Sequence, residues 1–268
     1  MTDLLQRRLR LLLVLVLVLV GCDAAAHEAR PLLWFDQGHG QVFKIDQQGA
    51  LDLSQLATQL TQCGWQVETG QQPLTPKLLK QVDGLVLSGA FRAYQEQEIA
   101  AIVAFLQAGK RVAIMLHIAP PYAGLLGQLG VIASNGVIRE SGDAVIGSEP
   151  LNFRVTRLDP HPLTAGVETL NLFGAWALLN HDPKVKVLAQ TSPQSWMDLN
   201  GNRQFDSGDA RQSFAVLLSG RVGSGEFVVF GDDALFQNRF IHLNLKLAEN
   251  LGRWLGRLPV GELAVAGQ

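Results

Sequence analysis

Residues 83–116 constrain the fold more than any other part of the sequence. Residues 84–87 (GLVL) form a short, unbroken apolar run, which is typical of a strand buried on both faces of a parallel sheet. Residues 95–108 place apolar side chains at helical spacing, and Gly109 then stops the helix. Residues 111–116 are a second apolar run. A strand, a helix and a strand in this span predict a right-handed βαβ unit with two parallel strands.

The first strand predicted for this sheet ends in a polar cluster. Residues 32–35 (LLWF) are apolar, and the chain continues with Asp36, two glycines and His39. Glycines allow the backbone to turn tightly, so an acid and an imidazole are left where the strand ends. We expect this strand near the middle of the sheet, with any ligand site at its carboxyl end.

The rest of the pattern predicts one domain over residues 31–258. Helices are expected at residues 51–63, 77–81 and 244–255 and within 122–130. Further strands are expected at residues 65–68, 153–156, 170–179 and 185–190, and a hairpin is expected from 214–218 and 226–230. Residues 131–150 are glycine-rich and are expected to be irregular. The fold class is therefore α/β, with a mostly parallel, doubly wound, flavodoxin-like sheet and an antiparallel extension.

Composition excludes several classes of protein. Of the 268 residues, 47% are hydrophobic and 17% are charged, which allows a sizeable core and argues against disorder. The net charge is −2 without a basic stripe, so nucleic acid is not an expected partner. The cysteines are Cys22 and Cys63, and the role expected for Cys22 leaves Cys63 unpaired. Neither a disulfide framework nor a cysteine-based zinc site is expected.

Residues 1–21 have the features of a secretory leader. Three arginines precede an apolar run at residues 11–20, which is too short to span a bilayer comfortably. The following Gly21 and Cys22 complete a tetrad that resembles the bacterial lipoprotein box. This resemblance implies a signal peptide at 1–21, lipidation of Cys22 with fatty acids such as palmitate, a tether at 22–30 and a tail at 259–268. The alternative is an uncleaved anchor in which the cysteine is incidental.

The residue after the lipidation site bears on localisation. Asp23 resembles the signal that keeps enterobacterial lipoproteins in the inner membrane. We therefore expect the protein to be anchored in that membrane, on its periplasmic face. Several acyl chains hold a protein firmly where one chain gives only marginal binding. The expected partners are the membrane, through the anchor, and a protein at the membrane.

Motifs along the chain carry a family resemblance. They are Asp36, His39 and Gly40 after the first strand, residues 83–89 and 109–115, Ser195-Trp196 before an acidic glycine-rich loop, and Gly231, Asp232 and Phe236 after the last strand. In this order they resemble class I glutamine amidotransferase-like domains. They resemble more nearly the uncharacterised relatives of these domains in bacterial membrane-associated proteins and in intraflagellar-transport and gliding-motility proteins. The resemblance covers residues 31–255 and implies an amidotransferase-like sheet.

The sequence departs from this family at the nucleophile. Amidotransferases place a catalytic cysteine on the turn that follows the strand corresponding to residues 111–116. Here residues 116–121 read LHIAPP, with neither cysteine nor serine, and the two prolines lack N–H groups that could stabilise an oxyanion. Cys63 lies on the predicted helix 51–63 and cannot replace the missing thiol. The sequence therefore predicts a catalytically inactive binding or scaffolding domain without glutaminase activity.

Polar side chains at several predicted strand ends are the candidate ligand site. They are Asp36, His39, Ser88, His117 and Asp232. Because parallel strands end at one edge of a sheet, we expect these residues to lie near one another. One interpretation is a small-molecule pocket, or a hydrolase of unknown substrate that uses Asp36, His39 and Asp232. The other is that the carboxylates cap loops and helix N-termini and the imidazoles are satisfied in the interior.

The polar loop at residues 196–209 contains a possible calcium site. Its oxygen-bearing side chains at positions one, three, five, nine and twelve of segment 198–209 are Asp198, Asn200, Asn202, Asp206 and Asp209. The spacing resembles an EF-hand-type loop, which wraps a hard cation in oxygens. Arg203 stands where such loops have glycine, and Asp209 is shorter than the usual glutamate. The alternative is a solvated Asn-Gly turn without metal.

Overall fold

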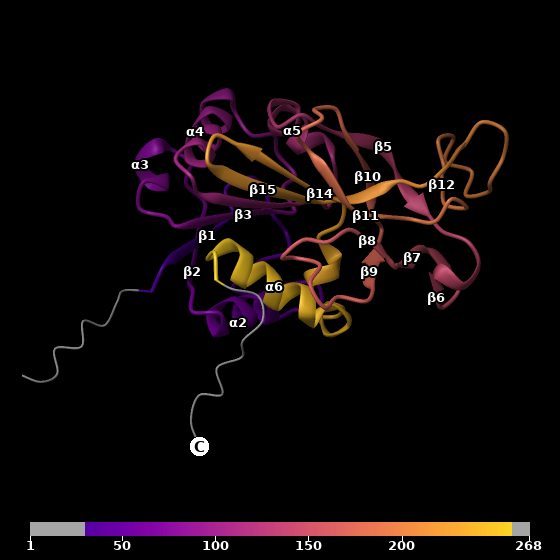
Figure 1. Ribbon diagram of the computed structural model, residues 1–268, viewed down its shortest axis with the longest axis horizontal. Helices are drawn as coiled ribbons and strands as arrows, with labels where there is room; N and C mark the ends of the chain where they lie inside the picture. Colours follow the sequence, from indigo (N-terminus) through magenta and orange to yellow (C-terminus); the bar gives the residue numbers. More distant parts are fainter. Residues whose placement is uncertain (1–29, 259–268) are drawn as a thin grey trace, which may run out of the picture. The chain divides into compact units, whose positions relative to one another are not determined.

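Five parallel strands form one half of the main sheet (Figure 1). The structure is a computed structural model that describes residues 30–258, and the predicted leader, Cys22, Asp23 and the tail lie outside the described residues. In spatial order the strands are β2 (Gln66–Gly70), β1 (Leu32–Asp36), β3 (Gly84–Ser88), β4 (Arg111–Met115) and β15 (Gly225–Phe230). Each strand pairs in parallel with its neighbour, and β3 and β4 form the predicted βαβ unit.

The position of β1 differs from the prediction. It lies beside the edge strand β2, so the expectation that it lies near the middle of the sheet is wrong. The physical reason is the direction in which the sheet grows. Within the described residues, the strands that join this sheet after β4 all add beyond β4, away from β1.

Except for the edge strand β2, the parallel strands are buried on both faces, and their side chains alternate between two hydrophobic cores. Leu33 and Phe35 of β1 contribute to one core, and Trp34 contributes to the other. In β3, Val86 lies in the first core, whereas its neighbours Leu85 and Leu87 lie in the second. This alternation follows from the two-residue period of a strand, and it explains the continuous apolar runs in the sequence.

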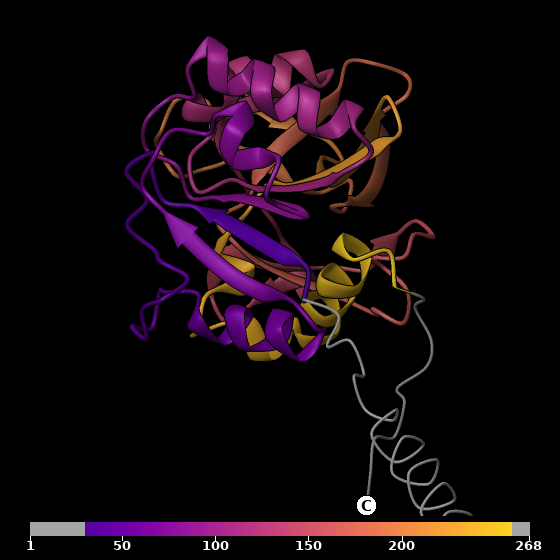
Figure 2. The same ribbon diagram turned by 90° about the vertical axis from the view of Figure 1, so that its left-hand side faces the viewer.

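Helices cover both faces of the parallel strands (Figure 2). On one face lie α3 (Pro76–Leu79), α4 (Glu96–Gln107) and α5 (Ala123–Gln128), and on the other lie α2 (Ser54–Gln62) and α6 (Leu245–Leu255). Single 3-10 turns occur at Pro120–Tyr122, Gly142–Ala144, Ala234–Phe236 and Ile241–Leu243. None of the helices within residues 30–258 has the length and apolar character needed to cross a membrane.

The other half of the main sheet is antiparallel, so the sheet has the predicted antiparallel strands but is mixed rather than mostly parallel as a whole. Continuing from β15, its strands are β14 (Ala215–Val222), β10 (Trp176–Asn180), β5 (Val131–Arg139), β12 (Trp196–Met197) and β13 (Ala210–Arg211). A side branch pairs β11 (Lys186–Gln190) with β14 and with β8 (Arg157–Leu158). A separate small sheet contains β6 (Val145–Ile146), β7 (Glu149–Val155) and β9 (Leu170–Phe173).

Two predictions in this half are wrong. Residues 131–150 are largely strand rather than irregular, because β5 is held by cross-strand pairing with β10 and β12 despite its polar, glycine-containing centre. Residues 170–179 are not one strand but parts of two, β9 and β10, which belong to different sheets. Gly174 separates them with a φ of 102°, a conformation that L side chains rarely adopt.

A glycine substitution tests the close packing of β15 against the end of α4. A Cβ atom added at Gly225 would lie 2.1 Å from the carbonyl oxygen of Leu106 and 2.5 Å from that of Lys110. Both neighbours are backbone atoms, so we expect Gly225→Ala to destabilise the protein by about 3 kcal/mol. Gly127→Ala, in the exposed face of α5 with no heavy atom within 4 Å, is the matched control and is expected to stabilise by about 0.5 kcal/mol. Urea unfolding of both variants measures the difference, and equal stabilities would contradict this packing.

Candidate functional site

The order of the parallel strands directs attention to their carboxyl ends. The order β2-β1-β3-β4-β15 is that of flavodoxin-like sheets, in which ligands bind where the strand order reverses, between the first and third strands. We call the edge where these strands end the carboxyl edge, and the edge where they begin the amino edge. Asp36 ends β1 and Ser88 ends β3, so both lie at this reversal on the carboxyl edge.

Asp36 is the centre of a buried hydrogen-bond network. Its Oδ2 atom accepts hydrogen bonds from His39 Nδ1 at 2.7 Å, Gln41 Nε2 at 2.8 Å and the Tyr94 hydroxyl at 2.9 Å. Its Oδ1 atom accepts the backbone N–H of Gly38 at 3.0 Å. The residue is only 2% exposed, so this carboxylate is solvated by protein donors in place of water.

A second carboxylate binds the other side of the His39 ring. Glu98 Oε2 lies 3.0 Å from His39 Nε2, and the ring also stacks on Tyr94 with centroids 3.9 Å apart. Glu98 additionally accepts the backbone N–H groups of Gln95 and Leu74, and the first of these contacts forms the capping box of α4. The position at which helix α4 begins therefore places the Glu98 carboxylate within hydrogen-bond distance of His39.

These contacts fix the protonation of His39. Burial lowers the pKa of this imidazole, but the hydrogen bonds and charges of Asp36 and then Glu98 outweigh burial, and the net pKa is raised. An imidazolium with both N–H groups donated to carboxylates has no free nitrogen to act as a base. Because His39 is also only 6% exposed, the network holds the edge together rather than offering a reactive group.

Asp232 is placed apart from this network. Its Oδ2 accepts the backbone N–H of Phe173 at 2.6 Å, and its Oδ1 accepts that of Ala234 at 2.8 Å. Burial, reinforced by the adjacent charge of Asp233, raises the pKa of Asp232 to about 7, while the two backbone donors act in the opposite direction. Of the two roles that the sequence allowed for Asp232, the geometry supports the capping of backbone N–H groups. Asp232 does not meet Asp36 and His39 around a reacting centre.

A second imidazole–carboxylate pair lies at the ends of β4 and β15. His117 Nδ1 is 3.1 Å from Asp233 Oδ1, and this hydrogen bond, opposed by burial, raises the pKa of His117. The ring lies near the aromatic rings of Phe43 and Phe91, with centroid distances of 4.8 and 5.4 Å. The His117 side chain is 34% exposed, unlike that of His39. Its backbone carbonyl accepts the indole N–H of Trp176, which fixes the turn.

Two buried polar atoms at this end of the sheet have no hydrogen-bond partner, and one of them belongs to Asp233 itself. They are the Oδ2 atom of Asp233 and the Oγ atom of Ser88. Gly89, with a φ of 61°, is the next residue after β3, and a Cβ atom there would lie 2.8 Å from Asp233 Oδ2. The absence of a side chain at Gly89 therefore allows the end of β3 to approach the Asp233 carboxylate.

The structure adds site residues that the sequence analysis did not select. Glu98, Tyr94 and Gln41 complete the Asp36 network, and Asp233 rather than Asp232 binds His117. A signal for Glu98 was present, because a helix that follows a parallel strand begins at the carboxyl edge and Glu98 lies in its first turn. Nothing in the sequence pattern distinguished Asp233 from its neighbour, since only the packing of the turn decides which carboxylate faces His117.

The candidate calcium loop satisfies its own polar groups. The carboxylate of Asp198 accepts the backbone N–H groups of Gly201 and Arg203, and Arg203 has a φ of 63° at the position where EF-hand-type loops have glycine. The side-chain amides of Asn200 and Asn202 both donate to Asp206, whose pKa is lowered first by the backbone N–H of Gly208. In the part of the chain that the structure describes, no group of three or more His, Cys, Asp or Glu side chains is placed to hold a metal ion. Calcium binding by this loop stays a prediction.

The fold and the site together define an α/β domain with a flavodoxin-like parallel half and a polar carboxyl edge. Residues 45–251 match the model of a family described as a domain of unknown function, DUF4350, and the chain belongs to this family. No curated protein sequence matches the chain.

Solved structures share the fold at low sequence identity. The N-terminal domain of mmIFT52 is 16% identical with a TM-score of 0.66, covering 83% of this chain and 96% of that one. A ThuA-like protein from Bacteroides uniformis is 14% identical with a TM-score of 0.52, covering 87% and 95%. The cytoplasmic protein STM3548 from Salmonella typhimurium is 12% identical with a TM-score of 0.54, covering 86% and 100%. The predicted resemblance to intraflagellar-transport domains is thus confirmed for the fold alone.

The His39 network predicts a dependence of stability on pH. Since the pKa of His39 in the folded protein is above its ordinary value of 6.5, the stabilisation is fully present below pH 6.5 and is lost as the pH rises through the folded-state pKa. Each pH unit between the two pKa values is worth about 1.4 kcal/mol. NMR titration of the His39 ring and urea unfolding across pH measure both quantities, and Glu98→Gln is expected to reduce the pH dependence.

The control for this experiment is a His117→Gln background. The pKa of His117 is also raised, so its titration would add a loss of stability with the same sign. An unfolding free energy that stays constant while the His39 resonance titrates would contradict the proposed contribution of the network.

Proposed function

We propose that this protein is a membrane-anchored binding module built on an amidotransferase-like domain that lacks the nucleophile. The observation that carries the proposal is the turn after β4, where His117 stands in a sequence without cysteine or serine. His117 is held by Asp233 and is partly exposed, so it is available for contact with a partner.

The contacts around His117 favour binding over hydrolysis. A catalytic base activates a nucleophile through a hydrogen bond between the two side chains. Ser88 is the hydroxyl at the neighbouring strand end, but it is 3% exposed and its Oγ makes no hydrogen bond to His117. The competing hydrolase hypothesis required Asp36, His39 and Asp232 around an open pocket, and their buried, occupied contacts give it no support.

The chemistry of this surface indicates what it binds. The raised pKa of His117 favours the imidazolium form, which donates a hydrogen bond to an anion. Phe91 is 41% exposed beside the ring and offers apolar contact next to the charge. A carboxylate side chain or C-terminus of a protein partner, flanked by an apolar group, matches both features.

Membrane anchoring is the second part of the proposal and is supported by the sequence. The lipoprotein-box resemblance at Cys22 places the acyl chains nine residues before Pro31, and Asp23 favours the inner membrane and its periplasmic face. Nine extended residues span about 30 Å at most, so the domain would stay close to the bilayer surface. A membrane protein is therefore the partner class that this surface is expected to meet.

Acylation of Cys22 is tested by metabolic labelling with a palmitate analogue. We expect the wild type to carry the label and to sediment with membranes, and Cys22→Ala to carry none, because the thiol is the only proposed acyl acceptor. Cys63→Ala is the matched control and is expected to keep the label. Membrane association without label in all three chains would favour the uncleaved anchor instead.

Partner contact at His117 is tested by photo-crosslinking in intact cells. The photoreactive analogue p-benzoylphenylalanine replaces Phe91 beside His117 or, as control, Phe205 on the remote polar loop, which is 44% exposed and therefore similarly accessible. We expect a discrete protein adduct from position 91 and none of that size from position 205.

The same adduct is expected to fall about tenfold in His117→Ala, which is the loss typical of one charge-assisted hydrogen bond. An adduct that forms equally from both positions, or that is unchanged in His117→Ala, would contradict the proposed binding surface.

A further inference from the structure

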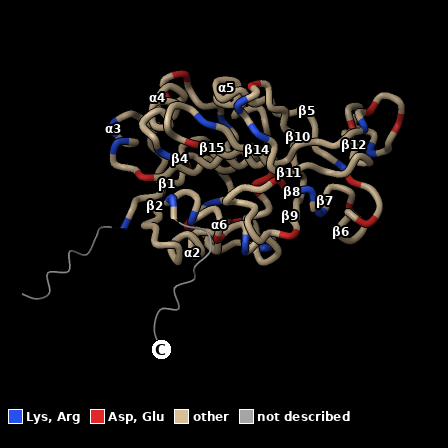
Figure 3. The backbone as a smooth tube through the Cα atoms, viewed as in Figure 1, with Lys and Arg blue, Asp and Glu red and all other residues tan. Residues whose placement is uncertain are grey.

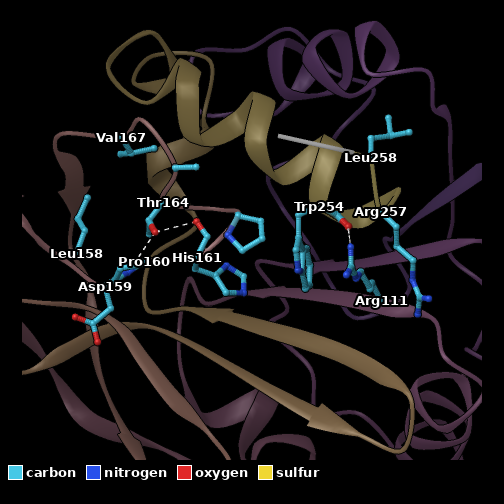
Figure 4. Close-up of a pocket in the computed structure, with 12 residues that line it drawn as sticks. Arg111, Leu158, Asp159, Pro160, His161, Thr164, Val167, Trp254, Arg257 and Leu258 are labelled. Carbon is cyan, nitrogen blue, oxygen red and sulfur yellow. Dashed lines mark hydrogen bonds between the residues drawn. The ribbon is translucent and has the colours of Figure 1, made fainter. Parts of the chain in front are cut away.

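A cavity of about 640 Å³ lies at the amino edge, the edge opposite the His117 surface (Figure 4). Its walls come from the start of β4, the loop of residues 158–167 and the C-terminal end of α6. The volume is within the range of small-molecule sites, about 300–1,000 Å³. The loop contains Pro160, His161 and Pro162, and the function proposed above does not use it.

The lining of this cavity combines an apolar wall with a cationic end. Leu158, Val167 and Trp254 supply apolar surface along the wall. Figure 4 shows Arg111 and Arg257 at one end and Asp159 at the opposite end. Ligand sites have this composition, a mainly apolar lining with a few polar groups that orient the ligand.

A second cavity of about 380 Å³ adjoins the first and adds further cations. His161 and Trp254 line both cavities, so these two side chains form the boundary between them. Lys184, Lys186 and Arg221 line the second cavity. Elsewhere in the described chain, charges of both signs are interspersed (Figure 3). The excess of cations is therefore a local property of these two cavities.

The carboxylate that lines the second cavity, that of Glu226, is already in ion pairs. Glu226 forms ion pairs with both Arg111 and Arg221. Among the described residues, no carboxylate forms an ion pair with Lys184, Lys186 or Arg257, and Asp159, at the far end, is the other acid lining the two cavities. The combined site thus keeps a net positive charge, which favours an anionic ligand.

Arg111 is held in one orientation by its neighbours. Its guanidinium donates to the backbone carbonyl of Trp254 and lies 5.1 Å from the centroid of the Trp254 ring. These contacts reduce the conformational entropy that Arg111 would lose on binding a ligand. Arg111 Nε and Trp254 Nε1 are buried donors without an acceptor in the structure, which is unusual for a folded protein.

His161 adds a neutral donor between the two cavities. Its Nδ1 accepts the backbone N–H of Leu163 at 3.2 Å, so in the neutral ring the proton is on Nε2. Burial lowers the pKa of His161, which keeps the ring neutral at physiological pH. Because the ring is already neutral, its Nε2–H can donate a hydrogen bond to an anion without a change in the protonation of His161.

From this geometry we propose that the amino-edge cavities bind a phosphate ester that carries an apolar substituent. The phosphate is attracted by the cations of the combined site, Arg257 in the first cavity and Lys184 and Lys186 in the second, and the substituent packs along the wall of Leu158, Val167 and Trp254. A phosphate ester brings one negative charge as a diester or about two as a monoester, together with several acceptor oxygens, which matches the cations that have no carboxylate partner. The headgroup of a membrane phospholipid and a free phosphate ester share this chemistry. The proposal does not depend on the His117 surface or on lipidation.

The test is calorimetric titration of the full chain in non-ionic detergent with four probes. Dihexanoyl-phosphatidylglycerol and hexyl phosphate both carry a phosphate ester with an apolar substituent, the first as a lipid headgroup and the second as a free ester. Dihexanoyl-phosphatidylcholine has the same chains and a phosphodiester whose charge is cancelled by the choline cation, and inorganic phosphate has no substituent. We expect one of the first two probes to bind with a heat that the phosphatidylcholine probe does not give.

Two matched double variants test where this binding occurs. Lys184→Gln/Lys186→Gln is expected to weaken binding about tenfold or more, since it removes two cations from the site. Lys77→Gln/Lys80→Gln, on exposed positions around α3, is expected to leave binding unchanged. Arg257→Gln, at an exposed residue on the other side of the site, provides an independent variant with the same expected direction.

Each outcome decides the proposal. Tight binding of phosphatidylglycerol alone supports a lipid headgroup, and equal binding of hexyl phosphate supports a free phosphate ester with an apolar substituent. Binding of inorganic phosphate as tight as that of both esters would overturn the role given to the apolar wall. No binding of any anionic probe, or binding that is insensitive to Lys184, Lys186 and Arg257, would overturn the site itself.

Discussion

The carboxylate of Asp36 organises the carboxyl edge of this domain. Its four accepted hydrogen bonds join the end of β1, the loop that follows it and Tyr94 before α4. Through His39 and Glu98 the same network reaches the first turn of α4 and Leu74. Three ionisable groups are buried together here, and each is tolerated only because the others compensate its charge. The crevice that flavodoxin-like sheets use for ligands is thereby filled with protein side chains.

The parallel strands divide the chemistry of the domain between two edges. At the carboxyl edge, the His39 network is closed and His117 with its aromatic neighbours is the accessible group. At the amino edge, cations surround cavities with a largely apolar wall. Strands of five residues separate these regions by about 17 Å. The two proposed binding surfaces therefore do not overlap.

Much of the parallel half could be predicted, because a strand buried on both faces leaves an unbroken apolar run such as residues 84–87. The antiparallel half was harder, since β5 contains Asn135 and Gly136 and exists through pairing with β10 and β12. In the site, the proximity of Asp36 and His39 follows from their spacing after one strand. The partnership of His39 with Glu98 joins residues 59 positions apart, and no local pattern records it.

The sequence by itself determined the class of the fold, the polar ends of its strands and the absence of cysteine and serine from the turn after β4. These properties are local, because each depends on the period of hydrophobicity or on the identity of one turn. Tertiary structure alone decided which carboxylate faces which imidazole, and that Asp232 caps backbone amides while Asp233 binds His117. It also brought Arg111, His161 and Trp254 to one cavity. Such contacts depend on how distant segments pack, and the free energy of that packing is not encoded in any short stretch of chain.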